Sequence, residues 1–230
     1  MSQAKERPIL FSGPMVRAIL EGRKTVTRRP VKGGQIPRLE YPDSAEYWVA
    51  VGQHHPRYGF VVHGKTEEEC AAKVGELGAC PFGQPGDRLW MRETFMDLRG
   101  TGVEHRPTPD SALQRYAYAA ECPPGSFSDE TRKDFGLKWK PSIHMPRAAC
   151  RILLEITDVR VERLQAITAE QAEAEGVDAA MCRQYLETTP SRYERKAAAI
   201  HGFPGLWQST GGDWNANPWV WVVEFKRVQP

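Results

Sequence analysis

A lysine and a threonine three residues apart, Lys24 and Thr27, are the residues of this 230-residue chain best suited to covalent chemistry. A threonine hydroxyl becomes an effective nucleophile when a base removes its proton, and a lysine amine acts as that base when burial or neighbouring cations lower its pKa. Arg23, Arg28 and Arg29 could supply the cations. The alternative is a solvated basic turn followed by ordinary strand residues. Spacing alone favours this alternative, because a regular strand places Lys24 and Thr27 on opposite faces.

The surrounding residues predict a strand, a helix, a turn and a second strand. Residues 9–11 form a short apolar run, as in a strand. Residue 12 or 13 can cap a helix that holds Pro14 in its first turn, and Gly22 is placed to end this helix in a left-handed conformation. The β-branched residues 25–27 favour an extended strand. Lys24 and Thr27 are therefore expected at the mouth of a turn.

The run from Ile19 to Arg28, Ile-Leu-Glu-Gly-Arg-Lys-Thr-Val-Thr-Arg, resembles the signature of ASCH domains. These are small PUA-like β-barrels, and the run is most similar to that of the bacterial N4-acetylcytidine amidohydrolases. In those enzymes the lysine and the second threonine of the motif are catalytic, together with a glutamate from a later helix. The resemblance thus implies catalytic roles for Lys24 and Thr27.

Residues 164–177 predict that later helix. Thr168 caps it, a glutamine three residues later completes a capping box, and Gly176 ends it. Glu175 falls in the last turn, where the helix dipole disfavours a negative charge, so we expect a cationic partner for it. The resemblance identifies Glu175 as the third catalytic residue, with Glu173 as the local competitor.

Several other residues are candidates for contacts with a substrate. In the loop 138–147 two prolines bracket an aromatic residue, a hydroxyl, a histidine and several cations, which are types that stack on a base and bond its edge. This loop resembles a segment of longer, phage-associated ASCH proteins. The candidates are Arg23, Arg92, Glu93, Trp139, Ser142, His144 and Arg147. A buried structural histidine at His144, and a surface pair at Arg92 and Glu93, are equally weighted alternatives.

The remaining elements complete the expected architecture. We predict hairpin strands over 47–51 and 58–62, a weakly helical surface run over 66–75, strands over 88–95, 115–119, 149–161 and 219–225, and a helix near 181–186. Trp219 and Trp221 alternate onto one face of the last strand, which favours a core role. With the resemblance, the expected fold class is mostly β with flanking helices (α+β), a PUA-like β-barrel. One domain, residues 1–230, would carry insertions at 33–80, 99–137 and 178–216.

Composition is typical of a soluble globular protein, with 40% hydrophobic and 26% charged residues. The sequence has no apolar run of membrane-spanning length and no signal-peptide pattern, so we expect a cytoplasmic protein without a membrane partner. Five cysteines, Cys70, Cys80, Cys122, Cys150 and Cys182, lack the close pairing of a zinc site and are expected to be reduced thiols. The adjacent His54 and His55 are a weak metal signal.

Charge is unevenly distributed. The first 32 residues hold eight Lys or Arg against two Glu, a net charge of +6, whereas the whole chain carries +2. The basic end could attract a phosphate or an RNA backbone, or it could be a solvated face; without a domain-wide basic surface, a small substrate is favoured.

The expected function is that of an amidohydrolase that removes the acyl group from N4-acylated cytidine or cytosine, without metal or cofactor. Its partner would be this small molecule, with RNA as a further candidate. Backbone N–H groups after Gly22 are candidates for holding the oxyanion. The alternative function is a non-catalytic RNA-binding or modified-base-reading module, for which the basic end and Trp139 would provide the contacts.

Overall fold

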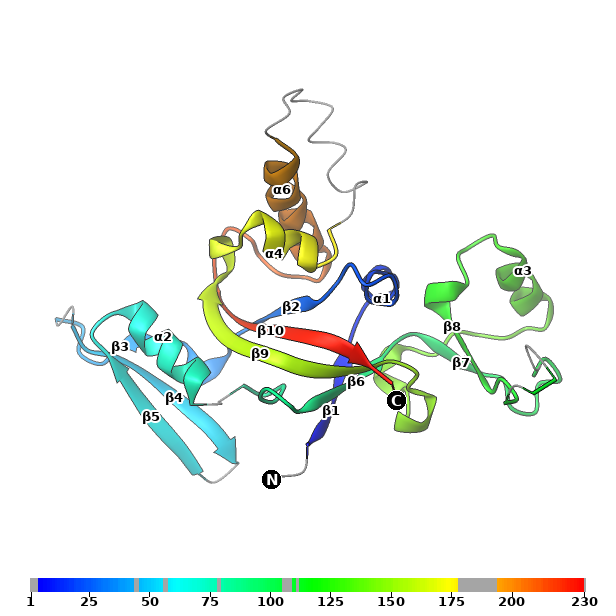
Figure 1. Cartoon of the computed structure of the whole chain (residues 1–230), viewed down its shortest axis with the longest axis horizontal. Coiled ribbons are helices and arrows are strands. Elements are labelled where there is room, and N and C mark those ends of the chain that lie inside the picture. Colours follow the sequence, from blue (N-terminus) through cyan, green and yellow to red (C-terminus); the bar gives the residue numbers. More distant parts are fainter. Residues whose placement is uncertain are drawn as a thin grey trace.

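The computed structural model describes residues 4–43, 46–55, 58–77, 80–104, 109–110, 112–177 and 194–229, without the side chains of residues 53–55, 58 and 194–197. A five-stranded sheet forms the centre, in the order β1-β6-β9-β10-β2 (Figure 1). Its strands are β1 (Glu6–Leu10), β2 (Val26–Pro30), β6 (Arg88–Arg92), β9 (Leu153–Arg163) and β10 (Trp219–Val228). β1 and β6 are parallel, and the other neighbours are antiparallel.

The two edge strands of this sheet, β1 and β2, are linked through a side chain. Among the described residues no backbone pairing joins them. Instead the Arg29 guanidinium on β2 donates a hydrogen bond to the carbonyl of Leu10 on β1 at 2.6 Å. The fold is therefore mixed α+β, and strand pairing among the described residues does not close the sheet into a barrel.

Strand β10 divides the hydrophobic core between the two faces of the sheet. Trp219, Trp221, Val223 and Phe225 belong to one buried cluster, which includes residues of β1, β6 and β9. Val220 and Val222 belong to a second cluster, beneath α4 (Ala169–Ala174) and α6 (Glu194–Ser209). This alternation follows from the two-residue period of a strand. The predicted core role of Trp219 and Trp221 is confirmed.

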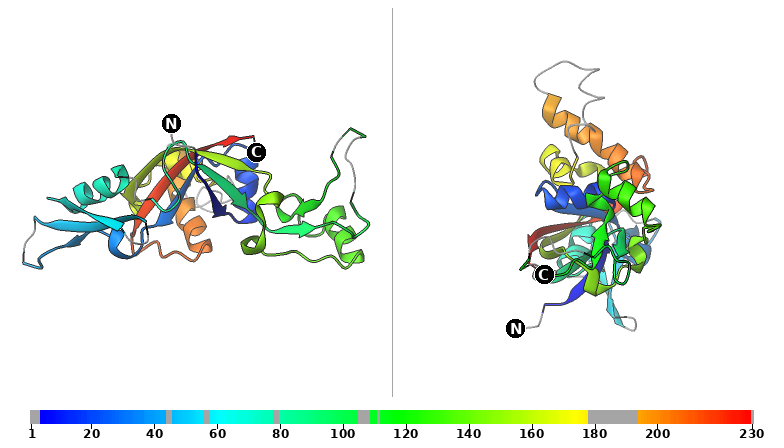
Figure 2. Two further views of the ribbon diagram at one scale, coloured as in Figure 1. Left: turned by 90° about the horizontal axis from the view of Figure 1, so that it is seen from below. Right: turned by 90° about the vertical axis from the view of Figure 1, so that its right-hand side faces the viewer.

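Two units extend from opposite ends of the central sheet (Figures 1 and 2). One holds the three-stranded sheet β3 (Arg38–Leu39), β4 (Trp48–His55) and β5 (Tyr58–Gly64), with α2 (Glu67–Glu76). The other holds β7 (Phe95–Asp97), β8 (Tyr116–Tyr118) and α3 (Phe127–Asp134). The predicted hairpin is thus confirmed as β4 and β5. Helix α2 is more than a surface feature, because Cys70, Ala71 and Val74 on it are buried.

Three elements differ from the sequence prediction. The helix predicted over 164–177 is a 3-10 turn, η5 (Leu164–Ala166), followed by the short α4. Helix α3 lies within a stretch for which only a strand was expected. Helix α6 lies within the insertion expected at 178–216, where a helix was expected only near 181–186, and it holds Pro204, a residue that normally argues against a helix. The helix predicted near 181–186 lies outside the described residues.

Shorter elements connect these parts. Helix α1 (Gly13–Leu20) joins β1 to β2, and its Val16 and Ile19 are buried. The 3-10 turns are η1 (Gly33–Gln35), η2 (Ala119–Glu121), η3 (Ser142–His144) and η4 (Arg147–Ala149). Within the described part of the chain, no helix combines the length and apolar character needed to cross a membrane.

Candidate active site

The turn between α1 and β2 joins the ends of two helices. Gly22 has φ +75°, the left-handed conformation expected for it. The N–H groups of Arg23 and Lys24 both donate to the carbonyl of Ala18, at 2.9 and 3.0 Å, and the N–H of Thr25 donates to Ala174 at the end of α4, at 2.8 Å. These three N–H groups are therefore already paired, and the oxyanion role considered for them in the sequence analysis is not supported.

The end of α4 is positioned by its caps. Thr168 and Gln171 form the predicted capping box. At the other end Gly176 has φ +89°, and a Cβ on it would lie 3.0 Å from Cβ of Ala18 and 3.2 Å from Cβ of Lys24. Glycine is required there both for its backbone conformation and for the close approach to α1. Glu175, the C-cap residue, is thereby held against Lys24.

Lys24 is completely buried and forms three hydrogen bonds. Its Nζ donates to the Glu175 carboxylate at 2.6 Å, to the Glu175 carbonyl at 2.9 Å and to the Val26 carbonyl at 2.8 Å. Burial lowers the pKa of Lys24, Glu175 opposes this shift, and Arg29 and Arg28 add to it. The cationic partner expected for Glu175 is thus present, and the amine is closer to losing its proton than an exposed lysine.

Arg28 holds the other side of Glu175. Its guanidinium donates to Glu175 at 3.2 Å and to the side-chain oxygen of Gln171 at 2.8 Å, and it approaches Glu162 at 3.5 Å. Burial also lowers the pKa of Arg29, against the attraction of Glu175. Three buried or half-buried cations therefore lie near the fully buried Glu175 carboxylate, and the partly exposed Glu162 pairs with one of them.

A cavity of about 30 Å³ lies beside this cluster. Thr27 and Glu175 line it together with Arg28 and Arg29, and α6 with the turn after it covers it through Phe203, Leu206, Trp207 and Thr210. Such a volume holds about one or two water molecules. The helix that was missed in the sequence analysis thus closes the space next to the predicted nucleophile.

Thr27 and Lys24 lie near each other although strand alternation would separate them. The strand begins at Val26, so Lys24 belongs to the turn and its side chain does not follow the alternation. Lys24 Nζ bonds the carbonyl of Val26, directly before Thr27, and Thr27 itself lines the cavity together with Glu175. The structure therefore brings the three predicted catalytic residues to one place, without a direct bond between Lys24 and the Thr27 hydroxyl.

Three residues that line the cavity, Arg28, Arg29 and Trp207, each carry a buried N–H donor without a partner among the described residues. The donors are the Nε atoms of Arg28 and Arg29 and the Nε1 atom of Trp207. Buried donors normally find an acceptor, and leaving one unpaired costs about 1–3 kcal/mol. An acceptor oxygen on a molecule in the cavity would be the matching partner.

Three of the other candidates, Arg23, Glu93 and Arg147, lie apart from this cavity. Arg23 is exposed at its charged end and pairs with Glu21. Glu93 is buried in a bidentate pair with Arg151, at 2.8 and 3.0 Å, and burial raises its pKa against the attraction of that arginine. Arg147 is exposed and pairs with Glu6 at 2.9 Å.

The remaining candidates lie in the loop 138–147 or contact it. They are Trp139, Ser142 and His144 in the loop, and Arg92 beside it. Arg92 donates to the carbonyl of Ser142 at 3.1 Å and lies over the Trp90 ring. His144 is exposed, so the alternative of a buried structural histidine is wrong. Trp139 lies under the Arg132 guanidinium, in a separate cavity on the unit of α3. The loop therefore does not contribute to the cavity of Thr27.

No family model, curated protein or solved structure matches this chain, so the family resemblance rests on the motif residues. Within the described ranges no group of three or more His, Cys, Asp or Glu could hold a metal ion. Cys70, Cys80, Cys122 and Cys150 are free thiols, and burial raises the pKa of Cys80 to about 11. Cys182 and the side chains of His54 and His55 lie outside the description.

Proposed function

We propose that the chain is an amidohydrolase that removes the acyl group from an N4-acylated cytosine nucleoside or base, and that its central sheet is a variant of the PUA-like ASCH fold. The observation that carries this proposal is the completely buried Lys24 amine, bonded to Glu175 at 2.6 Å beside a cavity that Thr27 lines. A buried, paired lysine with a lowered pKa near a threonine hydroxyl is a typical arrangement for activating a nucleophile.

The reaction follows from these groups. In its neutral form the Lys24 amine takes the proton of the Thr27 hydroxyl, whose oxygen adds to the carbonyl carbon of the amide. The Nε donors of Arg28 and Arg29 are suited to stabilise the resulting oxyanion, since both residues line the cavity and lack other partners at these atoms in the described structure. The Lys24 ammonium then returns its proton to the cytosine amine as the C–N bond breaks. Water hydrolyses the acyl-threonine ester and regenerates the hydroxyl.

Substrate access requires a change at α6. The cavity holds about one or two waters, whereas a small-molecule site normally encloses about 300–1,000 Å³. Phe203, Leu206 and Trp207 cover the cavity. Binding of a nucleoside must therefore displace this helix, and a small acyl group is the part of the substrate that fits next to Thr27 with least displacement.

The test is hydrolysis of N4-acetylcytidine without added metal, followed by chromatographic detection of cytidine. Thr27→Val removes the hydroxyl with little change of shape, and Thr25→Val removes an exposed hydroxyl two residues away as the matched control. We expect turnover by the parent and by Thr25→Val, and a loss of at least about 100-fold in Thr27→Val and in Lys24→Met.

Two results would contradict the proposal. Retained activity in Thr27→Val would remove the hydroxyl from the mechanism. An inactive parent, with N4-acetylcytidine and with larger N4-acyl analogues, would favour the non-catalytic module that reads RNA or a modified base. In that case oligonucleotide binding should weaken steeply as the salt concentration rises.

A further inference from the structure

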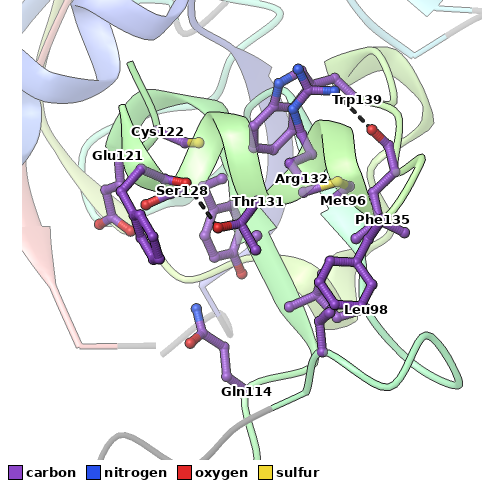
Figure 3. Close-up of a pocket in the computed structure, with 15 residues that line it drawn as sticks. Met96, Leu98, Gln114, Glu121, Cys122, Ser128, Thr131, Arg132, Phe135 and Trp139 are labelled. Atoms are coloured by element: carbon purple, nitrogen blue, oxygen red, sulfur yellow. Dashed lines mark hydrogen bonds between the residues drawn. The ribbon is translucent and has the colours of Figure 1, made fainter. Parts of the chain in front are cut away.

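A second cavity, of about 590 Å³, lies in the unit of β7, β8 and α3 (Figure 3). It shares no lining residue with the cavity of Thr27. Its volume falls within the range of about 300–1,000 Å³ that is typical of small-molecule sites. The amidohydrolase proposal does not use this space, so its purpose is a separate question.

The walls of this second cavity are largely apolar and aromatic. Met96, Leu98, Tyr118 and Trp139 line it from the hairpin and the loop after α3, and Phe127 and Phe135 line it from the two ends of α3. Phe127 is 88% exposed and Phe135 56% exposed. Neither ring belongs to the small core of this unit, which is formed around Phe95, Met145 and Ala149. The two exposed rings are thus available to cover an apolar ligand.

The charged groups at the cavity are already paired. Arg132 donates to Asp129 at 2.7 and 3.1 Å and to the carbonyl of Leu137 at 2.7 Å, and it lies over the Trp139 ring. Glu121 is paired with Arg151. A charged ligand would have to be buried without a free counter-charge, which is unfavourable. The electrostatics therefore favour an uncharged ligand.

Two polar side chains that line the cavity, Thr131 and Gln114, offer acceptor oxygens. The Thr131 hydroxyl donates to the carbonyl of Phe127 at 2.9 Å, which leaves its oxygen able to accept. The Gln114 amide nitrogen donates to the carbonyl of Tyr116 at 3.3 Å, and its oxygen remains as an acceptor at the cavity. Both side chains lie at the cavity in Figure 3. An N–H donor on the ligand would match them.

We propose that this cavity binds an uncharged aromatic compound of two or three rings that carries an N–H donor. The aromatic walls would hold the rings by stacking and by edge contacts, and the acceptors of Gln114 and Thr131 would orient the N–H group. This site would act independently of the chemistry at Lys24.

The experiment is a fluorescence titration of the full chain with N-phenyl-1-naphthylamine, an uncharged diaryl amine that becomes fluorescent in apolar cavities. Its analogue 1-anilinonaphthalene-8-sulfonate has the same rings with an added negative charge. We expect saturable binding of one uncharged probe per chain, and binding of the sulfonate that is weaker by at least about 10-fold.

Three variants locate the binding. Phe127→Ala truncates an exposed ring and is expected to weaken binding about fivefold. Thr131→Trp fills the cavity and should abolish it. Tyr41→Ala removes a 59% exposed ring on the opposite unit and should leave it unchanged.

Each contrary result overturns a defined part of the proposal. Absence of saturable binding to the parent, or unchanged binding in Thr131→Trp, would overturn the site. An unchanged affinity in Phe127→Ala would overturn the role of the exposed ring. Equal affinities for the two probes would overturn the assignment of an uncharged ligand.

Discussion

Replacing Glu175 by Gln tests the buried cluster most directly. The amide has nearly the shape of the carboxylate, so packing is kept, but the fully buried Lys24 loses its only anionic partner within hydrogen-bonding distance in the described structure. Arg28 loses one partner and keeps Gln171 and Glu162. Removing one member of a buried ion pair typically costs about 3–5 kcal/mol. For a urea dependence of about 2–3 kcal/mol per molar, the midpoint of unfolding should fall by about 1–2.5 M.

The loss should also depend on pH. Glu175 is the group that opposes the lowering of the Lys24 pKa, so its removal lowers that pKa further. At pH values between this lower pKa and the ordinary lysine pKa of 10.5, Lys24 is protonated in the unfolded chain but not in the folded chain. Stability in this interval rises with pH, so Glu175→Gln should lose most stability at low pH and less as the pH rises.

The measurement is urea unfolding, followed by the fluorescence of the seven tryptophans, at several pH values. Glu173→Gln is the matched control, because Glu173 lies exposed on the same helix and should change stability by less than about 0.5 kcal/mol. If Glu175→Gln lost less than about 1 kcal/mol, or lost the same at every pH, the Lys24–Glu175 pair would not have the energetic role that its burial implies.

Further predictions concern the approach of the helices and the chemistry. Gly176→Ala should lower the free energy of unfolding by more than the roughly 1–2 kcal/mol of left-handed strain, since its Cβ would meet Ala18 and Lys24. Gly22→Ala meets open space and should lose only the energy of that strain. Thermal or urea unfolding of the two variants compares the losses. Phe203→Ala should destabilise by about 3–5 kcal/mol and raise turnover of larger acyl groups relative to acetyl, measured by chromatography. Lys24→Arg should be inactive at every pH, because arginine stays protonated, while parent activity should fall as the pH is lowered and the neutral amine is lost.

The local elements of the site were largely predictable from the sequence. The helix from residue 13, the left-handed Gly22, the capping box at Thr168 and the buried alternation of Trp219 and Trp221 all agree with the structure. These features depend on short-range steric preferences and on the period of a strand, which neighbouring residues determine. The cationic partner of Glu175 was also expected, from its position at the end of a helix.

The contacts between distant segments were not predictable. Helix α6 contains Pro204 and two glycines, so its local pattern argues against the helix that covers the cavity. Likewise the loop 138–147 contains residues suited to stacking, yet its Trp139 belongs to a separate cavity.

The sequence by itself indicated Lys24 and Thr27 as groups suited to chemistry, because their residue types and the motif that resembles the ASCH signature lie in one short stretch, and the resemblance added Glu175. Only the tertiary structure decided that Lys24 and Glu175, separated by 151 positions, meet in a buried pair. It also decided that Arg28 and α6 complete the surroundings of Thr27. Burial, charge pairing and cavity size arise from segments that fold against one another, and no short stretch of residues encodes them alone.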